Sequence, residues 1–137
     1  MVDKREKASA GSRILVIDDD PVIRMLIASI LERRGYVVET ADSVAEALDV
    51  LARFTPDLIC CDLTMPEQDG LDFLRIRQQM PALKSVPVVV ITAVGEEKLL
   101  TQALELGAQA TLGKPFSRVQ LLKLITEYLV NKSPENG

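Results

Sequence analysis

The sequence contains no histidine, and this absence excludes more kinds of function than any other feature of its composition. Without histidine the chain cannot supply a Ser-His-Asp triad, a histidine-ligated zinc ion or a phosphohistidine carrier. It has two cysteines, which are adjacent at Cys60 and Cys61 within an apolar run. This placement predicts buried, reduced thiols and excludes both a disulfide framework and a four-cysteine zinc site. Any histidine chemistry in which the protein takes part must therefore come from a partner.

Long apolar runs and an excess of positive charge are also missing. The longest apolar run, residues 86–94, contains Pro87 and Thr92 and falls well short of the ~20 residues that a membrane span needs. Residues 1–12 carry mixed charge with no apolar stretch behind them, so they are no signal peptide. We therefore expect a cytoplasmic protein without a membrane partner. The formal net charge of −4 argues against direct nucleic-acid binding by this chain.

Short apolar runs alternate with amphipathic segments along the whole chain. Asp20 before Pro21 is a typical helix start, and the Ser43–Glu46 and Ser117–Gln120 spacings are capping-box patterns. These signals predict strands over about 13–17, 36–40, 57–61, 88–91 and 108–112, and helices over about 21–34, 43–54, 70–80, 96–106 and 117–130.

This regular alternation predicts an α/β fold of the (βα)5 type, a doubly wound parallel five-stranded sheet in a three-layer α/β/α arrangement. Residues 88–91 are apolar at successive positions, which is typical of a strand covered on both faces, so we expect this strand to be central. One domain is predicted over residues 13–130, with flexible tails at 1–12 and 131–137.

Polar residues follow the predicted strands where each strand ends. Asp18 and Asp19 follow the first strand, Asp62 the third, Thr92 ends the fourth and Lys114 follows the fifth. Because the carboxyl ends of parallel strands meet at one edge of the sheet, these side chains are expected to form one site.

Clustered carboxylates require a positive charge among them. Two carboxylates ~4 Å apart repel by about 4 kcal/mol at an effective dielectric constant of 20. Mg²⁺ or Mn²⁺ suits an all-oxygen ligand set, and Lys114 supplies a second positive charge. A site that combines a metal, a lysine, a hydroxyl and an aspartate can stabilise a transferring phosphoryl group, with one carboxylate as the nucleophile.

Four motifs at these strand ends carry a family resemblance. They are Ile14-Leu15-Val16-Ile17-Asp18-Asp19-Asp20-Pro21, Cys61-Asp62-Leu63-Thr64-Met65-Pro66 followed by Asp69-Gly70, Val90-Ile91-Thr92-Ala93, and Gly113-Lys114-Pro115-Phe116. Together they resemble the receiver domain of two-component response regulators, from about residue 13 to 130. The resemblance implies a flavodoxin-like sheet with strand order 2-1-3-4-5.

The resemblance also implies a role for each acidic residue. Asp62 would be the phosphoacceptor, and it would share a Mg²⁺ or Mn²⁺ ion with Asp18, Asp19 and the backbone carbonyl of Thr64. Asp20 would have no catalytic role and would serve only as the helix N-cap.

The remaining site residues would bind the phosphoryl group. Thr92 would bond a phosphoryl oxygen, Lys114 would pair with its charge, and backbone N–H groups near Thr64 and Ala93 would complete the cradle. One position departs from the family: Thr111 stands three residues before the lysine, where the family usually has an aromatic residue that turns inward on activation. The resemblance therefore predicts that this aromatic rotation does not occur here.

The resemblance implies a signalling domain and not a metabolic enzyme. Asp62 would take its phosphoryl group from a sensor histidine kinase or a histidine phosphotransfer protein, or from small donors, and would lose it by Mg²⁺-dependent hydrolysis. The output would be binding to a downstream protein target, with a phosphorylation-linked homodimer as an alternative. The surface formed by residues 96–106, 108–112 and 117–130 is expected to change on phosphorylation.

Two other functions remain as alternatives. The run from Asp18 to Val22 fits the D-x-D-x-[TV] pattern of haloacid-dehalogenase-type phosphatases, which would make Asp18 the nucleophile. However, no acidic pair follows Lys114 and the chain has no room for a substrate-covering cap. The second alternative is a receiver-like interaction domain that does not switch, which Thr111 keeps open. A flavin-binding module is disfavoured because three successive aspartates would repel its phosphate.

Overall fold

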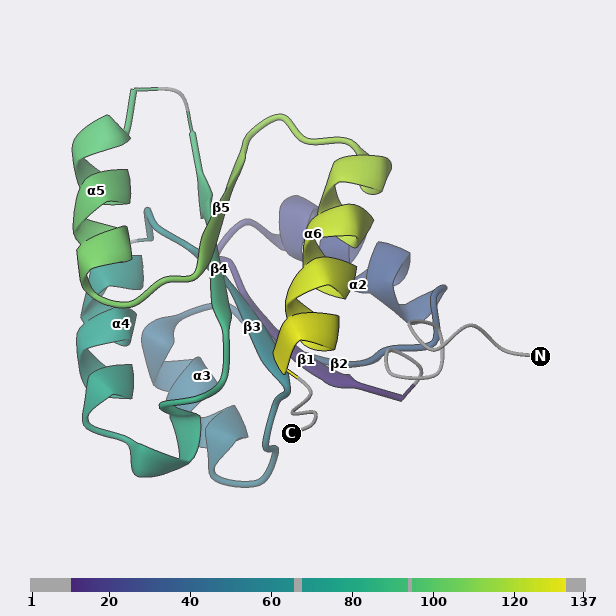
Figure 1. Cartoon of the computed structure of the whole chain (residues 1–137), viewed down its shortest axis with the longest axis horizontal. Helices are drawn as coiled ribbons and strands as arrows, with labels where there is room; N and C mark the ends of the chain where they lie inside the picture. The colour runs from purple at the N-terminus through teal and green to yellow at the C-terminus, as the bar shows by residue number, and fades with distance from the viewer. Residues whose placement is uncertain (1–10, 66–67, 94, 133–137) are drawn as a thin grey trace.

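Five parallel strands form one sheet in the order β2-β1-β3-β4-β5 (Figure 1). The computed structural model of the chain describes residues 11–65, 68–93 and 95–132. The predicted (βα)5 topology and strand order are confirmed. The strands are β1 (Arg13–Ile17), β2 (Val37–Ala41), β3 (Leu58–Asp62), β4 (Val88–Thr92) and β5 (Ala110–Gly113).

The connections between strands are helical, and local sequence signals set where the helices begin. The Asp20 carboxylate accepts hydrogen bonds from the N–H groups of Val22 and Ile23, as expected of an N-cap. Ser117 and Gln120 exchange the two hydrogen bonds of a capping box. The helices are α2 (Pro21–Glu32), α3 (Val44–Leu51), α4 (Gly70–Gln78), α5 (Glu97–Glu105) and α6 (Arg118–Lys132), with a 3₁₀ turn, η1 (Pro81–Leu83).

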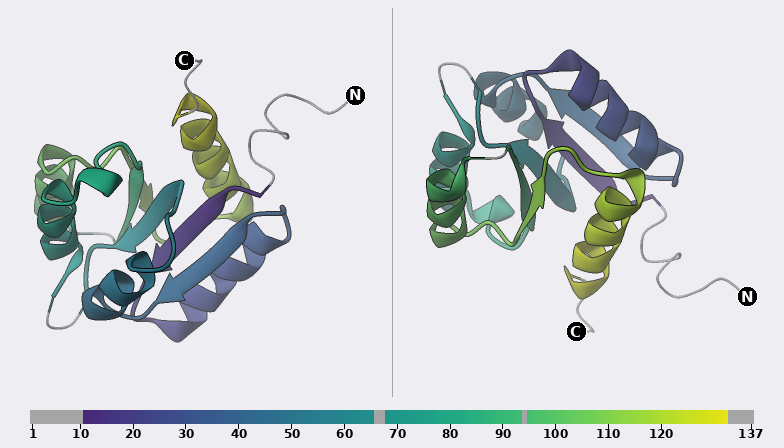
Figure 2. Two further views of the ribbon diagram at one scale, coloured as in Figure 1. Left: turned by 90° about the horizontal axis from the view of Figure 1, so that it is seen from below. Right: turned by 90° about the horizontal axis from the view of Figure 1, so that it is seen from above.

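The helices cover both faces of the sheet. Helices α2 and α6 pack on one face, and α3, α4 and α5 pack on the other (Figures 1 and 2). Successive strand residues alternate between the two cores: Leu15 and Ile17 face α3 and its neighbours, whereas Ile14 and Val16 face α2 and α6. Both faces of the sheet are therefore buried, which leaves its edges and the strand ends for polar groups.

The interior of the sheet agrees with the sequence predictions, and one helix start differs. The middle strand of the sheet is β3, as the predicted order implies, and β4 is an interior strand with a neighbour on each side and every residue buried, as predicted for residues 88–91. At the predicted capping box, the Ser43 hydroxyl accepts from the Glu46 N–H (3.1 Å) as expected, whereas Glu46 Oε1 accepts from the Asp42 N–H (2.6 Å), one residue before the N–H that would complete the box.

The two cysteines lie side by side in the sequence of β3. Cys60 and Cys61 are both free and buried, as predicted, and burial raises the pKa of Cys60 to about 12. Helix α6 continues to Lys132, and the Ser12 carbonyl accepts from the Val37 N–H. The rest of the predicted tails, residues 1–10 and 133–137, lies outside the described residues. No helix in the described part of the chain has the length and apolar character needed to cross a membrane.

Candidate functional site

Backbone pairing brings the predicted site residues to one edge of the sheet. β1 pairs with β3 so that Ile17 lies beside Cys61, and the next residues along the two strands are Asp18 and Asp62. On the other side of β3, the Lys114 N–H donates to the Thr92 carbonyl (2.8 Å), which continues the β4–β5 pairing beyond the strand. The parallel sheet therefore delivers the predicted acids, hydroxyl and lysine to the same place.

Asp18, Asp19 and Asp62 form an acidic cluster. One carboxylate oxygen from each lies within 4.8 Å of the others. Asp18 and Asp62 are buried, whereas Asp19 is exposed. Asp18 Oδ1 accepts from the Asp20 N–H (2.9 Å), but its buried Oδ2 accepts no hydrogen bond from any described residue. A buried carboxylate oxygen without a hydrogen bond, beside two further acids, is suited to a hard cation, so the cluster could bind a metal ion.

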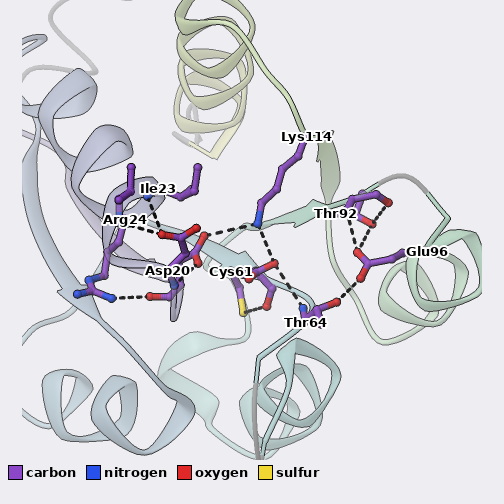
Figure 3. A network of polar contacts seen from close by, with 12 residues as sticks. Asp20, Ile23, Arg24, Cys61, Thr64, Thr92, Glu96 and Lys114 are labelled. Carbon is purple, nitrogen blue, oxygen red and sulfur yellow. Dashed lines mark hydrogen bonds and ion pairs between the residues drawn. The ribbon is translucent and has the colours of Figure 1, made fainter.

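Lys114 is the cation that faces this cluster. Its Nζ lies 3.6 Å from Asp62 Oδ1 and 4.0 Å from Asp18 Oδ2, so both contacts are ion pairs too long for a hydrogen bond. In Figure 3 the lysine side chain extends from the end of β5 into the space between the Asp20 loop and the Thr92–Glu96 pair. The Lys114 ammonium therefore forms ion pairs with two carboxylates, so the negative charges of the cluster outnumber the positive charge that faces them.

The pKa of Asp62 is raised in this buried and mostly negative cluster. Burial is the main cause that raises the pKa of Asp62 to about 6, and the negative charge of Asp18 adds to it. Lys114 and the Thr64 N–H, which donates to Asp62 Oδ1 (3.4 Å), oppose this rise. Burial also raises the pKa of Asp18, while the hydrogen bond from Asp20 and the charge of Lys114 lower it.

A pH dependence of stability follows from Asp62. The unfolded carboxyl has its ordinary pKa of 3.8 and the folded one a pKa of about 6, so between these values the folded chain binds an additional proton. In chelator, the free energy of unfolding should therefore fall as pH rises from about 4 to 6, by at most about 3 kcal/mol from this group, and stay low above it. Urea unfolding at pH 5 and 7 measures this. The fall should be smaller in Asp62→Asn, and an equal fall in both proteins would contradict the assigned burial of charge.

Thr64, Thr92 and Ala93 meet at a residue that the sequence analysis did not identify as part of the site. Glu96 Oε1 accepts from the Thr92 hydroxyl (2.9 Å) and the Ala93 N–H (2.8 Å), and Oε2 accepts from the Thr64 hydroxyl (Figure 3). In the sequence Glu96 marked only a helix start. The sequence offered one signal for this contact, an acidic residue four positions after a strand-end threonine. Acidic residues are common at helix N-termini, so this signal does not distinguish a site residue.

Arg24 and Asp69 make further contacts that were not predicted from the sequence. Arg24 Nη1 donates to the Asp18 carbonyl (2.8 Å) and so fixes the backbone that carries the acidic pair; nothing in the sequence marked it. Asp69 of the Asp69-Gly70 motif is the N-cap of α4 and forms a reciprocal capping box with Asp72.

The chain is similar to known proteins over most of its length. The family model described as the response regulator receiver domain matches residues 14–126. The chemotaxis protein CheY of Bacillus subtilis is 34% identical over 118 residues, which cover 85% of this chain and 97% of that protein. Sporulation initiation phosphotransferase F of the same organism is 31% identical over 123 residues, covering 90% and 98%. The chain therefore belongs to the response regulator receiver domain family, a family of signalling domains in two-component systems.

A solved structure supports the same assignment. The signal receiver domain of a signal transduction histidine kinase from Syntrophus aciditrophicus superposes with a TM-score of 0.81 at 31% identity, covering 88% of this chain and 92% of that one. The likeness covers most of the chain and supports the assignment of the fold to this family.

Proposed function

We propose that the chain is a phosphorylation switch in which Asp62 accepts a phosphoryl group. The observation that carries the proposal is the position of the Asp62 carboxylate, which is buried at the end of β3 with Lys114 Nζ 3.6 Å from Oδ1. Carboxylate oxygens of Asp18 and Asp19 lie within 4.8 Å of an Asp62 carboxylate oxygen. The Asp62 carboxylate can therefore act as a nucleophile with a lysine beside it and two further carboxylates able to share a metal ion.

Asp18, Asp19 and Asp62 are the residues that would hold Mg²⁺ or Mn²⁺, with the Thr64 carbonyl as a further ligand. The Asp18 Oδ2 atom, which is buried without a hydrogen bond, and the all-oxygen donor set fit a hard divalent ion. When bound, such an ion supplies charge neutralisation for the transferring phosphoryl oxygens. The chain itself supplies the nucleophile, the lysine and the hydrogen-bond donors.

In the proposed reaction an Asp62 carboxylate oxygen attacks phosphorus and forms a P–O bond. The P–N bond to the imidazole of a partner histidine breaks, and its electron pair stays on that nitrogen. Lys114 pairs with the negative charge of the phosphoryl oxygens, while the Thr92 hydroxyl and the Ala93 and Thr64 N–H groups donate to them. Hydrolysis later returns the carboxylate and releases inorganic phosphate.

The donor is a sensor histidine kinase or a histidine phosphotransfer protein, since this chain has no histidine of its own. The proposed output is binding to a downstream protein target in the cytoplasm, or formation of a homodimer, through the surface of α5, β5 and α6. Thr111, half-buried in β5, replaces the family's aromatic residue. We therefore assign the switch to Thr92 and the backbone that follows it.

The test is the intact mass of the chain after incubation with acetyl phosphate, with Mg²⁺ or with chelator. One phosphoryl group should be gained only with Mg²⁺. If no adduct forms and no inorganic phosphate is released while the donor remains intact, the chain would be an interaction domain without a switch.

Replacement of Lys114 should slow the reaction without abolishing it. Lys114→Ala removes the cation that pairs with the phosphoryl charge, so labelling by acetyl phosphate should be slower by roughly 10²-fold. The amide shifts of α5 and β5 should also change less on phosphorylation. Lys123→Ala, an exposed lysine of α6, is the matched control. Labelling and shift changes equal to those of the control would remove Lys114 from the mechanism.

A further inference from the structure

Glu96 occupies two of the three hydrogen-bond donors that the proposed function assigns to the phosphoryl group, the Thr92 hydroxyl and the Ala93 N–H. Its Oε1 is shared by the Thr92 hydroxyl (2.9 Å) and the Ala93 N–H (2.8 Å). Its other oxygen accepts from the Thr64 hydroxyl. These donors come from two loops, one after β3 and one after β4, and a single carboxylate joins them. Figure 3 shows the Glu96 side chain between the two threonines.

The surroundings keep Glu96 in its charged form. Partial burial raises the pKa of Glu96, but hydrogen bonds from Thr64, Ala93 and Thr92 and the positive charge of Lys114 outweigh it, and the pKa lies below its ordinary value. At neutral pH the group is therefore an anion held by neutral donors with a lysine nearby. A phosphoryl oxygen at the same site would require the same kind of contacts, hydrogen bonds from neutral donors and a positive charge nearby.

We propose that Glu96 is an internal substitute for the phosphoryl group, a carboxylate that must leave Thr92 and Ala93 before Asp62 can be phosphorylated. The inference rests on the proposed function. A phosphoryl group and the Glu96 carboxylate cannot share these donors, because both are anions and the Ala93 N–H has one hydrogen to donate. Glu96 therefore slows phosphoryl uptake.

The same displacement connects Asp62 to helix α5. Glu96 is the residue directly before Glu97, where α5 begins, and its backbone carbonyl accepts from the Leu100 N–H (2.9 Å). Release of the carboxylate removes three contacts that hold the first turn of α5 against the β3 and β4 loops. Glu96 thus transmits phosphorylation to α5 without an aromatic residue at position 111.

The test compares initial rates of labelling by acetyl phosphate with Mg²⁺, measured by intact mass. Glu96→Ala should be labelled about tenfold faster than the native chain, since one net charge-assisted hydrogen bond no longer has to be broken. Glu96→Gln keeps the shape but loses the charge, and should fall between them. The matched control is Glu97→Ala, an exposed acid one residue further on, which should label at the native rate.

A second readout separates competition from a general effect on folding. In a Thr92→Val background the acceleration by Glu96→Ala should shrink, because the hydroxyl for which the two anions compete is gone. In Glu96→Ala alone, the Leu100 amide should shift less on phosphorylation than it does in the native chain.

Each outcome decides the proposal. Equal or slower labelling of Glu96→Ala, or equal acceleration by Glu97→Ala, would overturn it while the proposed function stands. Labelling of Glu96→Ala but not of the native chain would support both. Absence of labelling and of phosphate release in all variants, with the donor intact, would overturn the proposed function and this inference with it.

Discussion

Gly70→Ala should lower the free energy of unfolding by about 3 kcal/mol, the upper part of the range for forcing an extra methyl group into a packed interior. Gly70 is the first residue of α4, and its N–H donates to the Leu63 carbonyl (3.0 Å). A Cβ at this position would lie 2.6 Å from the Asp62 carbonyl oxygen and 2.9 Å from Leu63 Cα. Both are backbone atoms of the segment that carries the phosphoacceptor, so neither can move away alone. Urea unfolding measures the loss.

Gly113→Ala is the control for this prediction. Gly113 also lies next to a site residue, but an added Cβ there would meet nothing within 4 Å, and its backbone is not in the left-handed region. Its stability should change by less than about 0.5 kcal/mol. If the two alanine variants were equally stable, the close approach of α4 to Asp62 and Leu63 would be wrong.

Asp62→Asn should abolish Mg²⁺-dependent phosphoryl uptake altogether. The amide has no anionic oxygen to attack phosphorus, and it removes one of three carboxylates from the acidic cluster. The fold should remain, because Asn is nearly isosteric and loses a buried charge. Without metal at pH 7 the variant should be more stable than the native chain by about 1–2 kcal/mol. Intact mass and urea unfolding measure the two effects.

The control for Asp62→Asn is the same substitution at Asp49, an exposed residue of α3. Asp49→Asn should keep both native labelling and native stability. Labelling that persisted in Asp62→Asn would place the nucleophile on another residue. A variant that lost stability would show that the Asp62 charge is compensated in the folded chain, contrary to its raised pKa.

The sequence was most informative where local chemistry decides structure. The N-cap at Asp20 and the capping box at Ser117 were predictable because each depends on residues within a single helical turn. The meeting of Asp18, Asp62 and Lys114 was predictable for another reason. Parallel strands place all their carboxyl ends at one edge, so strand boundaries alone were sufficient to bring these side chains together.

Contacts between different loops could not be predicted. Glu96 reaches Thr64 across 32 sequence positions, and nothing in either segment specifies that distance. The close packing of Gly70 on Asp62 is of the same kind, since it depends on how α4 returns to the end of β3. The apolar pattern by itself could not place β3 in the middle of the sheet, because β3 and β4 are both buried along their whole length; the strand order was predicted only from the family resemblance. Composition alone does not rank two such strands.

The central claim is that the phosphoryl group is carried by the carboxylate of Asp62, and it can be tested by locating the acyl phosphate. The chain is phosphorylated with acetyl phosphate and Mg²⁺ and then reduced with borohydride, which converts an acyl phosphate to an alcohol. Peptide mass spectrometry then finds the altered residue. We predict a single reduced side chain at position 62. A reduced side chain at Asp18 instead would identify the nucleophile of the phosphatase alternative and contradict the account.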